Sequence, residues 1–145
     1  MVNIKEVRVI DMMKPARTVG RDMPIAEALK LMKAEKLDFL SITDDNNRLI
    51  GAISENNFIR IVRHDSFSPM GDPLWFSSVE PEAGARPIST IMTNDITTIK
   101  PNEDISTALR VMSSVGYKLL HVVDSDGKLM GIVRIKDMFE KFLGV

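Results

Sequence analysis

The chain contains an internal repeat. Gly51 and Gly131 lie 80 residues apart, and the sequences around them are similar. Aligned without a gap, residues 25–62 and 105–142 are identical at 8 of 38 positions. A repeat of this kind indicates that one structural unit is used twice. Because each copy of about 55 to 60 residues is near the lower size limit for burying a core alone, we expect the two copies to complete each other.

The hydrophobic pattern predicts the same secondary structure in both copies. Apolar residues recur at i, i+3, i+4 and i+7 from Ile25 and again from Ile105, which predicts one buried helix face in each copy. Asp104 is suited to cap the later helix. Two short β-prone runs joined by a polar turn follow in each copy, at residues 39–43 and 49–53, and at 119–123 and 129–133. A second helix is then predicted, carrying Phe58, Ile59 and Val62 in the first copy and Met138, Phe139, Phe142 and Leu143 in the second.

With a leading strand before each first helix, each copy is predicted as β-α-β-β-α, which is an α+β fold with α/β character. The predicted organisation is a first repeat at residues 8–62, a connector at 63–86 and a second repeat at 87–143. The connector is proline-rich and holds the only tryptophan, Trp75, beside Phe76. We expect these two aromatic residues to anchor the connector onto a repeat or a partner subunit, with capture of a ligand or peptide as the alternative.

Charge and composition exclude several classes of function. Lys and Arg number 19 against 20 Asp and Glu, so the net charge of -1 provides no global field for nucleic acid or an anionic membrane. No apolar stretch approaches the roughly 20 residues of a membrane helix, and the beginning of the sequence lacks the apolar core of a secretory signal. We therefore expect a cytoplasmic protein. With no cysteine and only two histidines, the chain has no zinc motif, no thiol nucleophile and no phosphate-binding loop of the GxxxxGK type, which disfavours catalysis.

The order β-α-β-β-α, together with the segments Thr93–Met112 and Tyr117–Asp137, resembles the cystathionine-beta-synthase (CBS) domain. Two such copies resemble a CBS pair, or Bateman module. The resemblance implies tandem repeats packed about a pseudo-twofold axis into one module. It also implies a regulatory rather than catalytic protein, which requires no cofactor and commonly forms homodimers. Adenosine-containing ligands, such as AMP, ADP, ATP or S-adenosylmethionine, are expected in clefts between the repeats.

The ligand motif of this family is Gly, two apolar residues, Ser or Thr, two further residues and Asp. The second copy reads GIVRIKD from Gly131 to Asp137. By resemblance, Asp137 is the carboxylate for a ribose diol, with Gly131, Ile132 and Lys136 beside it. Arg134 stands at the hydroxyl position of the motif; we expect its guanidinium to pair with phosphate, and an exposed salt bridge is the alternative.

The first copy reads GAISENN, so Ile53, Ser54 and Asn57 hold the corresponding positions. Ser54 and Asn57 are also spaced as a helix N-cap with a reciprocal side chain, and both interpretations stay open. The resemblance further implies a hydroxyl contact from Thr98, with Thr97 beside it, and places Thr18 or Val19 at the corresponding position of the first copy. It implies a phosphate-directed charge at Lys118 and, at His121, an adenine contact made by backbone groups; for the imidazole itself the favoured interpretation is a packed side chain, with a ligand contact as the alternative.

Two unequal clefts are therefore predicted. One holds Asp137, Arg134 and Lys136 and faces the leading strand of the first copy; the other holds Ser54 and Asn57 and faces Thr98 and Lys118. The leading hypothesis is a ligand sensor that acts in trans on a client protein. The competing hypothesis is a ligand-free module for dimerisation or protein interaction through the apolar second helices. Nucleic-acid binding is disfavoured by the charge balance.

Overall fold

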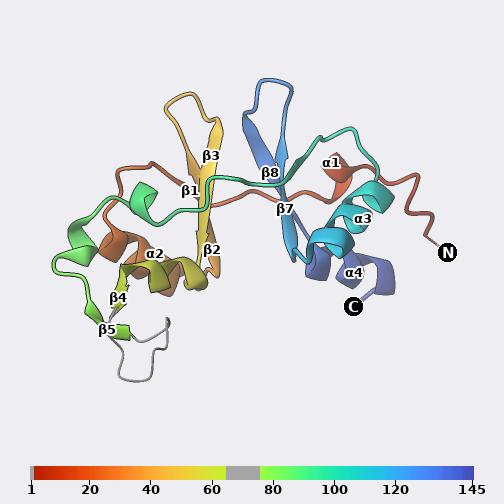
Figure 1. Ribbon diagram of the computed structural model, residues 1–145. Coiled ribbons are helices and arrows are strands. Elements are labelled where there is room, and N and C mark those ends of the chain that lie inside the picture. The colour runs from red at the N-terminus through yellow and green to blue at the C-terminus, as the bar shows by residue number, and fades with distance from the viewer. Residues whose placement is uncertain (1, 65–75) are drawn as a thin grey trace. The chain divides into compact units, whose positions relative to one another are not determined.

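The computed structural model describes residues 2–64 and 76–145 (Figure 1). A short helix, α1 (Val9–Met12), precedes the first copy. The first copy then consists of β1 (Thr18–Val19), α2 (Ile25–Glu35), β2 (Phe39–Thr43), β3 (Leu49–Ser54) and the 3-10 helix η1 (Glu55–Ile61). The second consists of β6 (Thr98–Ile99), α3 (Ile105–Val115), β7 (Leu119–Val123), β8 (Leu129–Arg134) and α4 (Ile135–Leu143). The α+β fold with two similar copies is confirmed.

The segment between the copies has secondary structure of its own. It contains the antiparallel pair β4 (Val62–His64) and β5 (Phe76–Val79), and the 3-10 helices η2 (Ala83–Ala85) and η3 (Ile88–Thr90). The prediction that Val62 belongs to a helix is wrong, because η1 ends at Ile61 and Val62 is extended, with φ -89° and ψ 132°. Trp75 lies outside the described residues, so the anchoring role predicted for Trp75 and Phe76 stays a prediction.

The two three-stranded sheets share one topology. Their strand orders are β1-β2-β3 and β6-β7-β8. The leading strand of each copy is parallel to the next strand, with Thr18 opposite Ser41 in the first sheet and Thr98 opposite His121 in the second. Strands β7 and β8 are antiparallel, as a hairpin requires. The two copies of the sequence repeat therefore have the same strand order and the same parallel pairing of their first two strands.

The compact units of the chain differ from the repeats. Unit 1 comprises residues 1–17, 43–50 and 95–145, and unit 2 comprises residues 18–42 and 51–94. The segment before the first copy thus packs with the second copy, and the segment before the second copy packs with the first. Unit 1 thus contains the second copy, the segment before the first copy and the hairpin turn of the first copy, and unit 2 contains the rest of the first copy with the segment before the second.

Helix α1 illustrates the exchange in unit 1. Val9 is 0% exposed and belongs to one core cluster with Ile105 and Met138. Its amide donates to the Glu103 carbonyl at 2.8 Å. Figure 1 shows α1, α3 and α4 close together at the second sheet. Burial of apolar surface contributed by α1 therefore stabilises the second copy.

The equivalent segment of unit 2 is η3 with the residues after it. Ile88 and Ile91 are each 0% exposed, and the Ile88 amide donates to the Met23 carbonyl at 2.7 Å. Thr93 forms an antiparallel bridge with Ala52 of β3. Residues that precede the second copy in the sequence therefore pack against the first copy and pair with its strand β3.

The hairpin turn of the first copy belongs to unit 1. The Leu49 amide donates to the Gly127 carbonyl at 3.2 Å, and the Leu129 amide donates to the Asn47 carbonyl at 2.9 Å. The Asn47 side chain adds a bond to the Leu129 carbonyl at 3.1 Å. The two turns therefore pair backbone to backbone, which accounts for the assignment of residues 43–50 to this unit.

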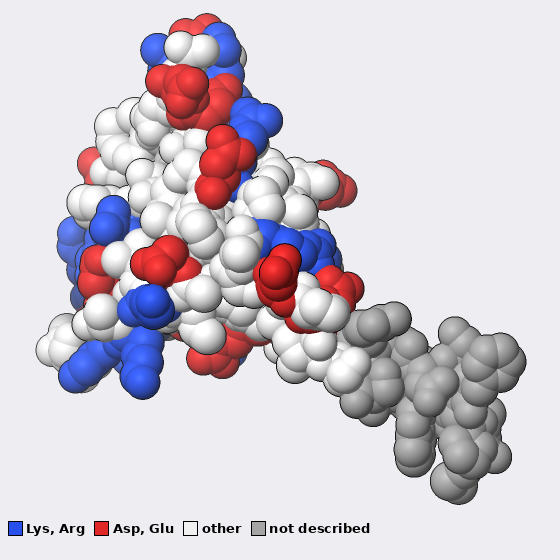
Figure 2. Space-filling view, turned by 90° about the vertical axis from the view of Figure 1, so that its left-hand side faces the viewer, with Lys and Arg blue, Asp and Glu red and all other residues white. Residues whose placement is uncertain are grey.

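The face of the molecule shown in Figure 2 carries charged side chains of both signs. On the face shown in Figure 2, acidic and basic residues are interspersed with uncharged surface, consistent with the net charge of -1. Among residues 2–64 and 76–145, no helix combines the length and the apolar character needed to span a membrane.

Candidate functional site

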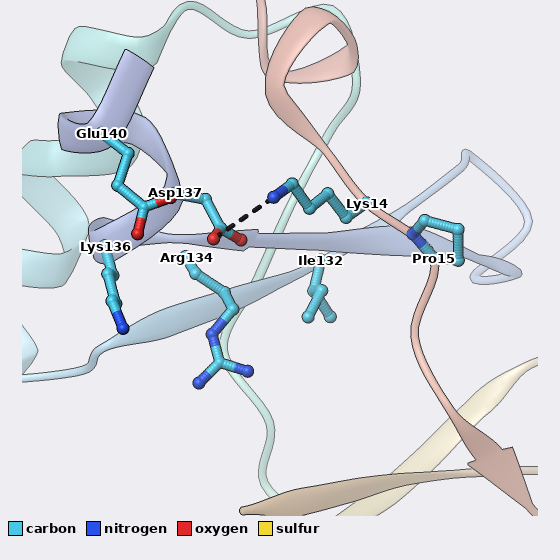
Figure 3. Close-up of a pocket in the computed structure, with 7 residues that line it drawn as sticks. All are labelled: Lys14, Pro15, Ile132, Arg134, Lys136, Asp137 and Glu140. Atoms are coloured by element: carbon cyan, nitrogen blue, oxygen red, sulfur yellow. Dashed lines mark ion pairs between the residues drawn. The ribbon is translucent and has the colours of Figure 1, made fainter. Parts of the chain in front are cut away.

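An open pocket of about 370 Å³ lies at the turn from β8 into α4 in unit 1 (Figure 3). Arg134 is the last residue of β8 and the N-cap of α4, so Lys136 and Asp137 fall in the first helical turn. The pocket brings together Ile132, Arg134, Lys136 and Asp137, all of which were predicted as site residues. Three further residues complete its lining: Lys14, Pro15 and Glu140.

Gly131 permits a close approach of two chain segments at this pocket. Lys14 and Ile132 form an antiparallel bridge, with amide-to-carbonyl distances of 2.8 Å and 2.9 Å. A Cβ atom on Gly131 would lie 2.6 Å from the Lys14 carbonyl oxygen, closer than such atoms approach. The glycine of the motif is therefore needed for the bridge, and the bridge sets the backbone position of Lys14.

Lys14 forms an ion pair with Asp137. Its Nζ lies 3.3 Å from Oδ1 of Asp137, and the two side chains are 59% and 19% exposed, respectively. In Figure 3 the ammonium group points toward the carboxylate, whereas the guanidinium of Arg134 points away from it. The lining as a whole contains three cationic side chains and two carboxylates, a formal excess of one positive charge. A carboxylate that can accept from two hydroxyl groups therefore stands beside groups that attract an anion.

The corresponding turn in unit 2 is occupied by its own contacts. Asn57 is 7% exposed. Its Oδ1 accepts from the Ser54 amide at 2.9 Å and from the Ser54 hydroxyl at 3.3 Å, while its Nδ2 donates to the Ile91 carbonyl at 2.7 Å and to Thr93 Oγ1 at 3.1 Å. A side-chain amide has two donors and one oxygen with two lone pairs, so its capacity is fully used. These contacts match the capping interpretation of Ser54 and Asn57.

The two turns have the same construction. A Cβ atom on Gly51 would lie 3.0 Å from the Thr93 carbonyl oxygen, and the Thr93 amide donates to the Ala52 carbonyl at 2.9 Å. Thr93 therefore holds the place in unit 2 that Lys14 holds in unit 1. In both units this residue contacts the third residue of the helix, as a hydroxyl to Asn57 or as an ammonium to Asp137.

His121 is buried in the sheet of unit 1. It is 4% exposed, and burial lowers its pKa from 6.5 to about 4. The imidazole is consequently neutral near pH 7, as expected for a packed side chain. Its neighbour across the sheet, Thr98, is exposed, and Thr97 is half-buried.

The remaining predicted residues belong to different parts of the two units. Lys118 is exposed in unit 1, and its carbonyl accepts from the Ile135 amide at 2.9 Å, which helps to fix the beginning of α4. Thr18 is half-buried and Ile53 is buried, both in unit 2. The two clefts predicted between the copies, and the roles of these residues in them, stay predictions.

The sequence contained a signal for Lys14 that was not used. Residues 9–14 read VIDMMK and residues 88–93 read ISTIMT, with methionine at the fifth position of both and with Lys14 and Thr93 at their ends. These segments lie 79 residues apart, one fewer than the two copies, so the alignment pairs Lys14 with Thr93 only after a one-residue gap. The charge of Glu140, one helical turn after Asp137, has no such counterpart in the motif.

Comparison with known proteins identifies the class to which this architecture belongs. The family model of the CBS domain matches residues 4–64 and 88–144. The chain therefore belongs to the CBS domain family, as a tandem pair of the repeats that the sequence and the sheets display.

Relatives match over most of the chain. An uncharacterized 17.7 kDa protein of Acidianus ambivalens is 28% identical over 127 residues, covering 88% of this chain and 67% of the relative. An uncharacterized protein of Methanocaldococcus jannaschii is 24% identical, with coverage of 98% and 95%. The match to inosine-5'-monophosphate dehydrogenase of the same organism covers 88% of this chain but 22% of the enzyme.

Solved structures share the fold. The crystal structure of CBSX2 in complex with AMP superimposes with a TM-score of 0.75 at 23% identity, covering 95% of this chain and 97% of that one. The CBS domain pair of protein MJ0100, in complex with 5'-methylthioadenosine and S-adenosyl-L-methionine, gives a TM-score of 0.70 at 23% identity and the same coverage.

Proposed function

We propose that this protein is a non-catalytic regulatory module that binds an adenosine-containing ligand, AMP, ADP, ATP or S-adenosylmethionine, at the pocket between β8 and α4. The observation that carries the proposal is the convergence of Asp137, Arg134 and Lys136 on one pocket of about 370 Å³. An ionised carboxylate binds two neighbouring ribose hydroxyls, and the two cationic side chains suit the charged tail of a nucleotide. The volume lies in the range of small-molecule sites.

Similar structures support this choice of ligand class. CBSX2 was crystallised with AMP, the cytosolic domain of the Mg²⁺ channel MgtE with ATP, and the MJ0100 pair with 5'-methylthioadenosine and S-adenosyl-L-methionine. These ligands share adenosine and differ in the charge of the group attached to it. Asp137 would bind the ribose that all these ligands share. The cationic side chains of the lining would distinguish the ligands by the charge of the attached group.

In the proposed mechanism the ligand shifts a conformational equilibrium and is not converted. It can do so only to the extent that it binds one arrangement of the chain more tightly than another. The protein would act in trans, as a cytoplasmic homodimer, on a client protein whose binding depends on that arrangement.

One set of exposed side chains favours a second function, a ligand-free assembly module. On α4, Phe139 is 42% exposed and Leu143 is 71% exposed, and Val115 and Tyr117 of the same unit are 46% and 43% exposed. Exposed apolar side chains mark an interaction surface where they form a continuous patch. The partner in this alternative is a second copy or a client protein.

A thermal-shift screen with AMP, ADP, ATP, S-adenosylmethionine and cyclic dinucleotides separates the two functions. A ligand present at 100 times its dissociation constant is expected to add about 2.7 kcal/mol to the free energy of unfolding. Asp137→Asn should weaken binding of that ligand about tenfold, because a charge-assisted hydrogen bond becomes a neutral one. Since its ion pair with Lys14 is largely solvated, the same substitution should lower stability by less than about 1 kcal/mol.

Asp45→Asn is the matched control, since it makes the same chemical change at an exposed residue of a hairpin turn. It should leave affinity unchanged. If no ligand in the panel shifts the unfolding transition and the protein forms a dimer that depends on concentration, the assembly function replaces the sensor function.

A further inference from the structure

We infer that Lys14 is a specificity-determining residue that makes the pocket prefer a phosphorylated adenosine ligand over a neutral or cationic one. The inference rests on the proposed function and specifies the ligand's charge. Lys14 lies outside the ligand motif of either copy, and it reaches the pocket only because the segment before the first copy packs in unit 1.

The position of Lys14 is fixed by the backbone. Its amide and carbonyl both bond to Ile132, at 2.8 Å and 2.9 Å, and the absent side chain of Gly131 leaves room for its carbonyl oxygen. A side chain held by its backbone in this way loses less conformational freedom on binding than one on a free loop. The ammonium group is therefore presented to the pocket before a ligand arrives.

Lys14 gives the residues that line the pocket their net positive charge. With it, three cationic side chains accompany two carboxylates; without it, the numbers are equal. Lys14 also neutralises Asp137 locally across 3.3 Å, which reduces the repulsion between that carboxylate and an approaching phosphate. S-Adenosylmethionine, with a positive sulfonium next to its ribose, would instead meet a like charge.

The equivalent residue of unit 2 shows what the turn contains without this charge. Thr93 forms the same bridge beside Gly51, and its hydroxyl contacts an uncharged Asn57. The lysine and the aspartate of unit 1 thus lie at the positions that a neutral pair occupies in unit 2. Structure alone does not require the charge at this position, because unit 2 forms the same bridge without it.

The test is to compare ligands that share the adenine and ribose and differ in the charge of the group at the 5' position. Dissociation constants for AMP, adenosine, 5'-methylthioadenosine and S-adenosylmethionine are measured by calorimetry on the full chain and on Lys14→Thr, which installs the residue of unit 2. The variant should bind AMP about tenfold more weakly, as expected for loss of one charge-assisted contact, and should bind adenosine within about twofold of the original affinity. The preference for AMP over S-adenosylmethionine should narrow by a similar factor.

Two further variants keep the test independent of folding. Lys14→Arg retains the charge and should retain the preference for AMP over adenosine. Lys5→Thr removes an exposed charge of unit 1 that is not part of the pocket lining, and should retain it as well. In the original protein, the ratio of the adenosine to the AMP dissociation constant should fall as salt is raised, because exposed charges are screened.

The outcomes separate this inference from the function on which it rests. If the original protein binds none of the four ligands, the proposed function fails, and the role of Lys14 fails with it. If it binds AMP and adenosine equally well, or if Lys14→Thr weakens both to the same extent, the ligand site stands and only the selective role of Lys14 is overturned.

Discussion

The turns at Ser54–Asn57 and at Arg134–Asp137 occupy matching positions in the two copies, yet their polar groups are used differently. In the first, Asn57 is 7% exposed and makes four hydrogen bonds within its own unit. In the second, Asp137 is 19% exposed and pairs with the ammonium group of Lys14, whose side chain is 59% exposed. In the first copy, the polar groups of the motif bind the segment that contains Ile91 and Thr93. In the second copy, they line a pocket.

The difference shows that the two copies of one motif can have different roles, one in holding the chain and the other in forming a pocket. In both copies a glycine admits the neighbouring segment, and a residue of that segment contacts the third residue of the following helix. Asparagine supplies two donors, which bind the carbonyl of Ile91 and the hydroxyl of Thr93. Aspartate has no donor when ionised, so it cannot hold a carbonyl and remains available to hydroxyl groups.

The largest expected loss of stability comes from a substitution of Asn57, the third residue of η1. Asn57→Asp places a carboxylate oxygen against the Ile91 carbonyl, 2.7 Å away at present, in a buried position. Arg60 donates to the same carbonyl at 2.8 Å and offsets part of the new charge. Loss of the two donors and burial of the carboxylate should therefore cost about 2 to 3 kcal/mol of the free energy of unfolding. Chemical denaturation measures this cost directly.

Asn56→Asp is the control, because it makes the same change at the adjacent, exposed residue. It should change stability by less than about 0.5 kcal/mol. Equal stabilities of Asn57→Asp and the original protein would mean that the contacts of Asn57 do not hold the segment, and that the two turns differ less than their hydrogen bonds indicate.

Much of the fold was accessible from local pattern. Helices α2 and α3 begin at Ile25 and Ile105, where the apolar periodicity predicted them, and Asp104 caps α3 by accepting from the Thr107 amide at 2.9 Å. Strands β2 and β7 match the predicted runs at 39–43 and 119–123. These features depend on residues close together in the sequence, and the repeat supplies each of them twice.

The exchange of segments between the copies was not accessible in the same way. Periodicity shows that Ile105 has a buried face, but not that Val9, 96 positions earlier in the chain, helps to cover it. The ion pair between Lys14 and Asp137 depends on the same exchange, and so the sequence motif identified the carboxylate without its partner. The 3-10 helix η1 leads directly into β4, which pairs with β5 in a segment that the repeat does not contain.

The next comparison concerns the residue opposite the leading strand of each sheet, Ser41 in the first and His121 in the second. Because burial lowers the pKa of His121 from 6.5 to about 4, the unfolded chain binds a proton between these pH values that the folded chain does not. Stability should therefore fall as pH is lowered through this window, by up to about 3 kcal/mol from this side chain. His121→Ser, which copies the first sheet, should remove that part of the slope.

The measurement is the free energy of unfolding at several pH values from 7 to 4, with the slopes compared rather than the absolute stabilities, since the smaller serine also leaves a cavity. His64 is the only other histidine, and His64→Ser controls for the loss of a histidine as such. An unchanged slope in His121→Ser would show that this imidazole is protonated in the folded protein at the same pH as in the unfolded chain.

The smallest expected effect sharpens the comparison of the two glycines. In Gly131→Ala the new Cβ would meet the backbone oxygen of Lys14 at 2.6 Å, whereas in Gly51→Ala the closest contact, also at 2.6 Å, is the flexible side chain of Met92. A side chain can move aside more cheaply than a bridged backbone, so we expect losses of about 2 kcal/mol and about 1 kcal/mol, respectively. Urea denaturation with unchanged m values measures the difference.

Gly131→Ala should have a second consequence that Gly51→Ala lacks. By displacing the backbone of Lys14 it moves the ammonium group away from Asp137, so the preference for AMP over adenosine should weaken together with stability. Gly51→Ala acts on the turn of unit 2, where Asn57 already uses all its polar groups, and should leave that preference intact. If both glycine variants lost the same stability and the same preference, the two turns would be equivalent in ligand binding, and the division of roles between them would be wrong.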